Sequence, residues 1–351
     1  MKKPKIKKLV PKKLRKNTPA ATEQTDSGPV PRITNETVAE HREEVLSSAR
    51  KYIYPLQHSK HKIVLISTGL FITALVIFFT YTTLSLYRFK SNSGFLYGVT
   101  QVIPFPIARA GGRFVSYENY LFELRHYVHY YETQQPQDFS AAQLNDYKKR
   151  ALSKVVDDAY VKQLADKYKI SVSDQELNDQ IAIVRNQNRL GANDKGFEDV
   201  LRENFGWSVS DFKRELKQQL LAQKVVATLD TNTNALAKAA QAELNSGADF
   251  AAVAKKYSQD SATKDNGGDY GFLLDKTNRD IPAAVTDAVF KLKPGQTSGI
   301  INTGYGLEID KNLGNQGDKI HAAHIVFAYK DINSYLNELK SKQKTRFYIS
   351  Q

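Results

Sequence analysis

The 351-residue sequence contains no cysteine, which excludes a disulfide framework, a thiolate nucleophile and a cysteine-ligated metal. Its seven histidines show no His-Glu-x-x-His or comparable ligand spacing. We therefore expect neither a metal site nor a cofactor. The lack of cysteine fits an exported protein that folds without an oxidase.

Acidic residues are missing from the N-terminus, where Glu23 is the first. Residues 1–62 hold fifteen Lys or Arg against six Asp or Glu, so +9 of the net charge of +13 lies there. A nucleic-acid surface on the rest of the chain is disfavoured, and no nucleic-acid partner is expected. We interpret 2–16 as a solvated tail that touches anionic lipid, with nucleic-acid or ribosome contact as the less favoured alternative.

Charge is absent from residues 63–87, a run of twenty-five. As a helix this run is about 37 Å long, enough to cross a hydrocarbon core of about 30 Å. Its lack of a polar face argues against a buried soluble helix, and the long preceding segment argues against a cleavable signal peptide. The excess of basic residues before the run places the N-terminus in the cytoplasm and residues 88–351 outside.

Helical periodicity dominates the stretch that follows a proline-rich connector at 102–106. Apolar residues recur every three or four residues in 117–131, as on one face of a helix. We favour ordinary core packing for the aromatic residues of this helix over an exposed groove that binds client protein. Ser173 and Glu176 have the spacing of a capping box. Further helices are predicted at 141–168, 173–189, 197–204 and 210–229. We predict an all-helical domain.

Three segments in the C-terminal half carry a recognisable pattern. Residues 249–260 begin Asp-Phe and end Tyr-Ser-Gln-Asp, residues 266–272 read Asn-Gly-Gly-Asp-Tyr-Gly-Phe, and 288–299 contain Phe-Lys-Leu-Lys-Pro-Gly-Gln. In type and order this run resembles a parvulin-type peptidyl-prolyl isomerase domain, with 235–246 as its first helix. Residues 148–158 and 166–173 are similar to the chaperone domain of SurA-like and PrsA-like extracytoplasmic foldases, which implies binding of unfolded polypeptide.

The strand and histidine that open a parvulin domain are missing before 235. A segment of that type, with His324, instead follows the last expected strand at 307–311. A hairpin through 314–318 would return 320–327 to the centre of the sheet, so we predict a circularly permuted domain whose new break is the polar segment 230–234. The alternative is a truncated second isomerase domain beginning at residue 320.

The resemblance implies which residues form the site. His324 takes the place of the first-strand histidine, and Asp260 lies where members have Cys or Asp beside the bound amide. Thr303 matches a polar position near the histidine pair, and Glu308 replaces the second histidine, which puts activity in doubt. The implied apolar wall around the substrate proline consists of Tyr270, Leu273, Ile281, Val285 and Phe290.

Together these features predict an α+β protein with one transmembrane helix, an all-helical SurA-N-like domain and a parvulin-like domain with a four-stranded antiparallel sheet. The function expected is a single-pass, membrane-anchored prolyl isomerase and foldase whose partners are the bilayer and unfolded or proline-containing clients. A catalytically weak or inactive chaperone or binding module of the same fold is the alternative. The expected segments are a cytoplasmic tail 1–62, the span 63–87, a linker 88–107, the helical domain 108–230, the isomerase domain 231–329 and a C-terminal helix or tail 330–351.

Overall fold

The computed structural model describes residues 33–53, 56–134, 140–188 and 193–349, so the predicted basic run 2–16 lies outside the described residues. The chain divides into two units, residues 1–77 and 78–351. The elements of the helical part are α1 (Asn35–Ile53), α2 (Leu56–Thr83), a π-helical turn (Leu84–Arg88), α3 (Gly94–Val102), β1 (Pro106–Ala110), β2 (Arg113–Ser116), α4 (Tyr117–Gln134), α5 (Ala141–Tyr168), α6 (Asp174–Asn188), α7 (Asp194–Phe205) and α8 (Val209–Leu229). The remaining elements are α9 (Thr231–Asn245), α10 (Phe250–Tyr257), a 3-10 turn (Lys264–Asn266), β3 (Asp269–Leu274), α11 (Ala283–Val289), β4 (Ile301–Asn302), β5 (Gly306–Gln316), β6 (Lys319–Ala328), α12 (Ile332–Lys342) and β7 (Arg346–Phe347).

The apolar run predicted at 63–87 lies in α2 and the π-helical turn that continues it. Within the described ranges, this is one helix with the length and composition needed to cross a membrane. A signal sequence near an N-terminus shares both features. The helix thus agrees in type and position with the predicted span.

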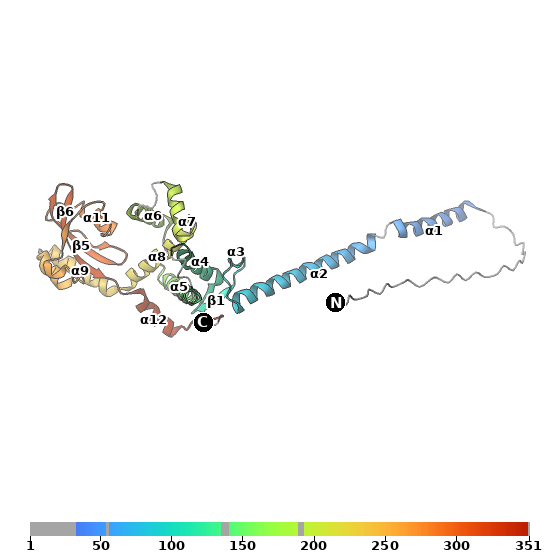
Figure 1. Cartoon of the computed structure of the whole chain (residues 1–351), viewed down its shortest axis with the longest axis horizontal. Coiled ribbons are helices and arrows are strands. Elements are labelled where there is room, and N and C mark those ends of the chain that lie inside the picture. The colour runs from blue at the N-terminus through green and yellow to red at the C-terminus, as the bar shows by residue number, and fades with distance from the viewer. Residues whose placement is uncertain (1–32, 54–55, 135–139, 189–192, 350–351) are drawn as a thin grey trace, which may run out of the picture. The chain divides into compact units, whose positions relative to one another are not determined.

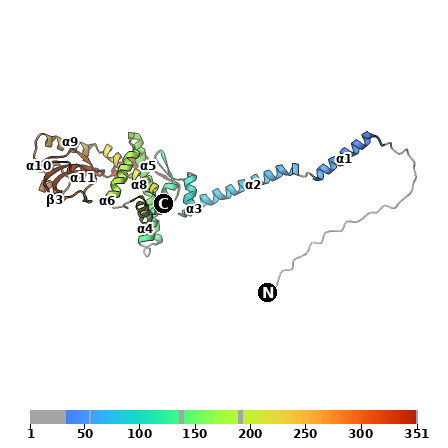
Figure 2. The same cartoon turned by 90° about the horizontal axis from the view of Figure 1, so that it is seen from above.

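The helical domain is built around α4, α5 and α8, as Figures 1 and 2 show. The structure confirms the helix predicted at 141–168 and places the others within a few residues of their predicted ends. The predicted capping box is confirmed, because the amide of Ser173 donates to Oε2 of Glu176 (2.7 Å) and the amide of Glu176 donates to Oγ of Ser173 (3.2 Å). Tyr117 and Tyr120 are buried in the core, as favoured for that helix.

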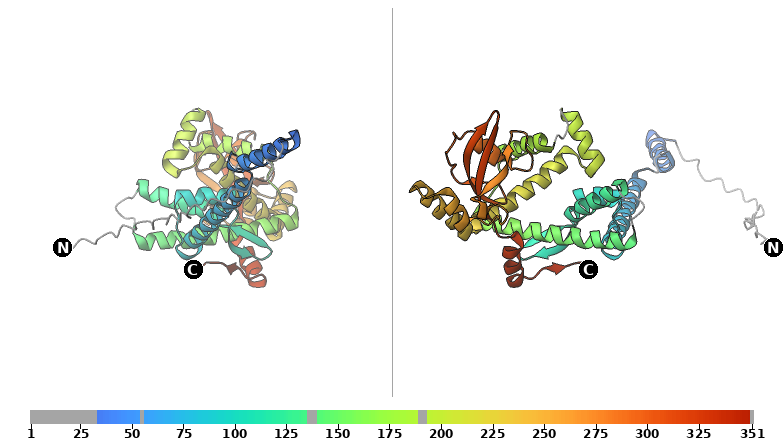
Figure 3. Two further views of the ribbon diagram at one scale, coloured as in Figure 1. Left: turned by 90° about the vertical axis from the view of Figure 1, so that its right-hand side faces the viewer. Right: turned by 60° about the vertical axis from the view of Figure 1, so that its left-hand side comes forward.

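Segments from both ends of the chain complete this domain. Leu96 and Ile107, in the stretch expected to be a linker, are buried in its core. After the sheet domain the chain returns, and α12 lies beside α5 in Figure 3 and buries Leu336 against it. A three-stranded sheet of order β2-β1-β7 also belongs here, which the sequence analysis did not predict because its strands are only two to five residues long.

The second domain is an antiparallel sheet of order β3-β6-β5-β4. One face packs under α9 and α10, where Ile309, Ile325 and Phe327 are fully buried. The other face carries α11, whose Val285 and Val289 pack against Leu274 of β3. A two-residue turn at Gly317 and Asp318 joins β5 to β6, and positive φ (+64°) at Gly317 suits such a hairpin. The segment 320–327 therefore occupies the central position expected for it.

The segment 230–234, predicted to be the polar break of a permuted domain, is only partly exposed: Thr231 and Asn232 face solvent, whereas Asp230 and Thr233 are buried. Asp230 is 1% exposed and caps α9, accepting from the amide of Thr233 at 3.1 Å. Its other carboxylate oxygen accepts from the amide of Lys330 (2.8 Å), and the hydroxyl of Thr233 donates to the carbonyl of Ala328 (3.3 Å). These polar side chains are buried because they satisfy the backbone at the end of β6.

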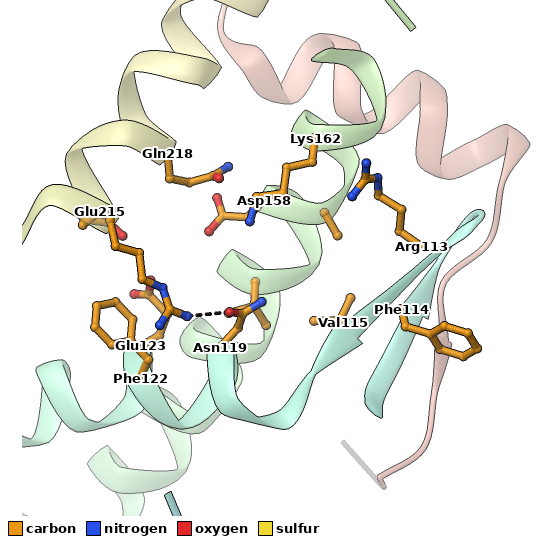
Figure 4. Close-up of a pocket in the computed structure, with 13 residues that line it drawn as sticks. Arg113, Phe114, Val115, Asn119, Phe122, Glu123, Asp158, Lys162, Glu215 and Gln218 are labelled. Atoms are coloured by element: carbon orange, nitrogen blue, oxygen red, sulfur yellow. Dashed lines mark hydrogen bonds between the residues drawn. The ribbon is translucent and has the colours of Figure 1, made fainter. Parts of the chain in front are cut away.

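Glu123, Asp158 and Glu215 line a pocket of about 220 Å³ in the helical domain (Figure 4). Lys154 lies within 3.1 Å of Glu123, Asp158 and Glu215, so three carboxylates share one ammonium. Burial, reinforced by Glu215 and opposed by Lys154, raises the pKa of Glu123 to about 7. Glu123 therefore binds a proton at a higher pH than a free glutamate does.

The raised pKa of Glu123 predicts a pH-dependent stability of the helical domain. The folded pKa lies above the ordinary value of 4.5, so this contribution is fully present below about pH 4.5 and is lost as pH rises through 7. Glu123→Gln, which is neutral at every pH, should flatten this decline. The denaturation midpoint followed by fluorescence of Trp207, the one tryptophan, measures it because Trp207 stacks on His126 of α4 in this domain. Glu132→Gln, an exposed change on the same helix, is the control, and an equal decline in all three proteins would contradict the prediction.

Candidate active site

The face of the sheet that carries α11 also carries a polar cluster. Glu308 and Asp310 are two residues apart on β5, and side chains at that spacing on a strand point to the same face of the sheet. His324 of β6 stands directly opposite Asp310 in the register. The pairing of the two strands thus places an imidazole beside two carboxylates.

His324 is held from its outer side by the loop after α10. Its Nε2 lies 3.0 Å from Oδ2 of Asp260 and 3.0 Å from the hydroxyl of Thr263, which itself donates to Asp260. That hydroxyl, the amide of Ala262 and the imidazole keep the pKa of Asp260 below its usual value. Because an ionised carboxylate only accepts, it fixes the ring hydrogen on Nε2 and leaves Nδ1 facing the two carboxylates of β5.

On the side that faces β5, the polar atoms of the cluster lack hydrogen-bond partners. Nδ1 of His324 lies 3.7 Å from Oε2 of Glu308, too far for a hydrogen bond. Burial alone lowers the pKa of His324, but the carboxylates of Glu308 and Asp260 outweigh it, so the net direction is upward. Asp310 is 0% exposed, and burial together with the charge of Glu308 raises its pKa to about 8.

Tyr270 connects the polar cluster to an apolar one. Its hydroxyl donates to Oδ1 of Asp310 (3.0 Å), and its ring lies 4.1 Å from the imidazole of His324, centroid to centroid. The apolar residues packed with it share one cluster with α11. They include Ile281, Val285 and Phe290. The site therefore has a polar floor beside an apolar wall.

Most of the residues predicted for the site lie together. Asp260, His324, Glu308 and Tyr270 are in contact, and the apolar cluster contains the predicted wall residues other than Leu273. Leu273 lies along β3 opposite His321, outside that cluster. Val285 is 0% exposed, so it backs the wall from within the core.

Thr303 lies apart from the His324 network. Its hydroxyl donates to the carbonyl of Gly306 (3.2 Å) in the turn between β4 and β5. Thr263, which the sequence analysis missed, instead bonds the imidazole. The Asp-x-x-Thr spacing from Asp260 was an available signal for it. Asp310 was also missed, although strand alternation with Glu308 places both carboxylates on one face.

Known families match both domains in sequence. The model of the SurA-like N-terminal domain matches residues 56–226, and that of the PPIC-type PPIase domain matches 220–312. This chain carries a SurA-like N-terminal domain followed by a PPIC-type parvulin domain. The match to the PPIC-type domain ends before β6, the strand that supplies His324.

Curated relatives of the chain are foldases. It is 30% identical over 167 residues to foldase protein PrsA 3 of Bacillus anthracis, covering 43% of this chain and 56% of that protein. It is 34% identical over 171 residues to foldase protein PrsA of Lactococcus lactis subsp. cremoris, covering 45% and 52%. The chain spans a little over half the length of these relatives.

Two solved structures also match the chain. They are peptidylprolyl isomerase PrsA of Bacillus anthracis (22% identity, TM-score 0.18, covering 54% of this chain and 88% of that one) and foldase protein PrsA of Streptococcus pneumoniae (19%, 0.19, 60% and 84%). At these TM-scores the superpositions add nothing to the description of the PPIC-type domain above.

Gly268 of the PPIC-type domain is predicted to be irreplaceable, because its φ is +82° and a Cβ there would overlap the carbonyl oxygen of His324. Its own carbonyl accepts from the amide of His324 (2.8 Å). Gly268→Ala should lower the free energy of unfolding of this domain by at least about 1–3 kcal/mol. Faster amide hydrogen exchange in β6 measures this. Gly299→Ala, where a Cβ meets open space, is the control, and equal exchange in both variants would refute the argument.

Proposed function

We propose that this protein is a membrane-anchored, extracytoplasmic peptidyl-prolyl cis/trans isomerase and foldase acting on exported, unfolded or proline-containing polypeptides. The observation that carries the proposal is the contact of Asp260 with His324 beside the ring of Tyr270, next to an apolar cluster. The PPIC-type PPIase domain supports the isomerase reaction, and the relatives named foldases support the role in folding.

Isomerisation requires no nucleophile, because no bond is made or broken. The barrier of about 20 kcal/mol arises from lost amide resonance as the X-Pro bond twists. Planar resonance places negative charge on the carbonyl oxygen. A carboxylate such as Asp260, ionised and 27% exposed, disfavours that planar form more than the twisted one when the oxygen lies near it. The apolar cluster receives the proline ring and excludes water.

Client polypeptide has a second surface next to this domain. A pocket of about 580 Å³ lies between α6 and α8 on one side and the segments 279–284 and 302–305 on the other. Leu216 and Leu220 line it from α8, and Thr303 and Tyr305 from the turn before β5. We assign to it the client residues that flank the proline, and this gives Thr303 a role in client binding rather than in the histidine network.

We also infer that the isomerase domain is circularly permuted. In an ordinary parvulin the first strand leads directly into the first helix. Here the end of β6 meets the start of α9 through hydrogen bonds of Asp230 and Thr233, although about a hundred residues separate them in sequence. This contact is the place where the ancestral connection would have been cut. If residue 320 began a truncated second isomerase domain, β6 would not be expected to pair with β5 of the first domain.

The alternative function is a binding module that has lost catalysis. Glu308 in place of the second family histidine and the complete burial of Val285 favour it. Both functions use the same surface for the client. They differ in whether the twisted amide is stabilised.

Prolyl isomerisation is the decisive measurement. The full chain in detergent should accelerate cis/trans conversion of a proline peptide in a protease-coupled assay. Asp260→Ala and His324→Ala should each lower kcat/KM by at least about tenfold, since each removes a group from beside the amide. The control is His321→Ala on the same strand, whose imidazole bonds Asp269 away from the cluster. A parent rate equal to the uncatalysed rate, with protection of an aggregating client intact, would establish the binding module instead.

The membrane anchor can be tested with single cysteines, because the chain has none of its own. In spheroplasts of a bacterial host, a membrane-impermeant maleimide should label Asn245→Cys directly and Ser27→Cys only after lysis. The basic excess before the apolar helix is the physical reason. Release of the chain by alkaline carbonate, or labelling in the reverse order, would contradict the proposed anchor or its orientation.

A further inference from the structure

Each of the three side chains at the centre of the site has one polar atom without a hydrogen-bond partner. Oε2 of Glu308, Oδ2 of Asp310 and Nδ1 of His324 are buried and have no hydrogen-bond partner. Single ligand atoms of these three residues all lie within 4.8 Å of one another. Buried polar atoms are normally paired, so three unpaired atoms on residues this close together require an explanation.

The outer atoms of two of these side chains, His324 and Asp310, already have hydrogen-bond partners. Nε2 of His324 lies 3.0 Å from Oδ2 of Asp260, and Oδ1 of Asp310 accepts from the hydroxyl of Tyr270 at 3.0 Å. Metal-binding imidazoles and carboxylates characteristically bond an outer partner in this way, which fixes the tautomer and aims the free atom at the ion. This arrangement leaves Nδ1 of His324 and Oδ2 of Asp310 available as metal ligands.

The cluster also lacks a permanent counter-charge. Among the ion pairs of the described residues, Glu308 pairs with His324 alone, and Asp310 has no Lys or Arg within 4.0 Å. Asp310 is 0% exposed, and burying a carboxylate without a cation is costly. Either a proton or a cation must therefore be held at this point.

We propose that Glu308, Asp310 and His324 bind one divalent transition-metal ion of the zinc class through Oε2, Oδ2 and Nδ1. Three protein ligands on two adjacent strands, one nitrogen and two oxygens, fit a four-coordinate ion with an open position. A calcium ion, which takes six to eight oxygens, does not fit this donor set. The ligands come from two different strands, β5 and β6, so no short sequence motif predicts the site.

Zinc binding to the full chain in detergent, stripped with EDTA, tests the proposal by equilibrium dialysis against zinc sulfate and elemental analysis. Other histidines contribute to the total, so the informative quantity is a difference. The parent should retain about one equivalent more zinc than Asp310→Asn. The control Asp287→Asn, an exposed carboxylate of the same domain, should match the parent.

Equal zinc in the parent and Asp310→Asn would overturn the proposal and leave a proton shared within the cluster. If Asp310→Asn does not fold by circular dichroism, Glu308→Gln is judged by the same difference. A readout on the unsubstituted protein decides if both fail: zinc should shift the 15N resonance of Nδ1 of His324 and leave its Nε2 proton in place, and an unmoved Nδ1 would refute binding. These measurements contain no prolyl substrate, so they stand whether or not isomerisation is found.

Discussion

The antiparallel pairing of β5 with β6 is the constraint on which the C-terminal domain depends. It fills the centre of the sheet, supplies Ile325 and Phe327 to the core beneath α9 and α10, and sets His324 opposite Asp310. Without β6, β3 and β5 would each have an unpaired edge inside a packed domain. Fold and site therefore share one cause, because the strand that completes the sheet also carries the imidazole.

The same pairing explains how the two domains are connected. Residues 231–329 leave and return at neighbouring points, since Asp230 accepts from the amide of Lys330. The chain then re-enters the helical domain, where Leu336 packs in the core and β7 pairs with β1. The sheet domain is thus an insertion within the helical one, and the connections at both of its ends are held by a single buried carboxylate.

Carboxylates are buried together at two places, and their negative charge is balanced differently at each. In the helical domain Lys154 pairs with Glu123, Asp158 and Glu215, so these three carboxylates have a cation among them. Beneath the candidate active site, Glu308 and Asp310 face one imidazole and no lysine or arginine pairs with them among the described residues. A buried excess of carboxylate is tolerable where a proton, an ammonium or a metal offsets it. Of these two clusters, only the second contains buried side-chain atoms without a hydrogen-bond partner.

The sequence by itself determined what depends on local order: the apolar run of α2, the periodicity of α5 and α8, the Ser173 capping box and the parvulin motifs from 249 to 299. Each is encoded by residues within a turn or two of one another. Tertiary structure alone decided that Asp230 is buried, that short strands from 106–116 and 346–347 form a sheet, and that Thr263 rather than Thr303 meets His324. Those outcomes depend on contacts between residues distant in the chain, because a polar side chain is buried or exposed according to the backbone that packs against it, and no local pattern specifies that partner.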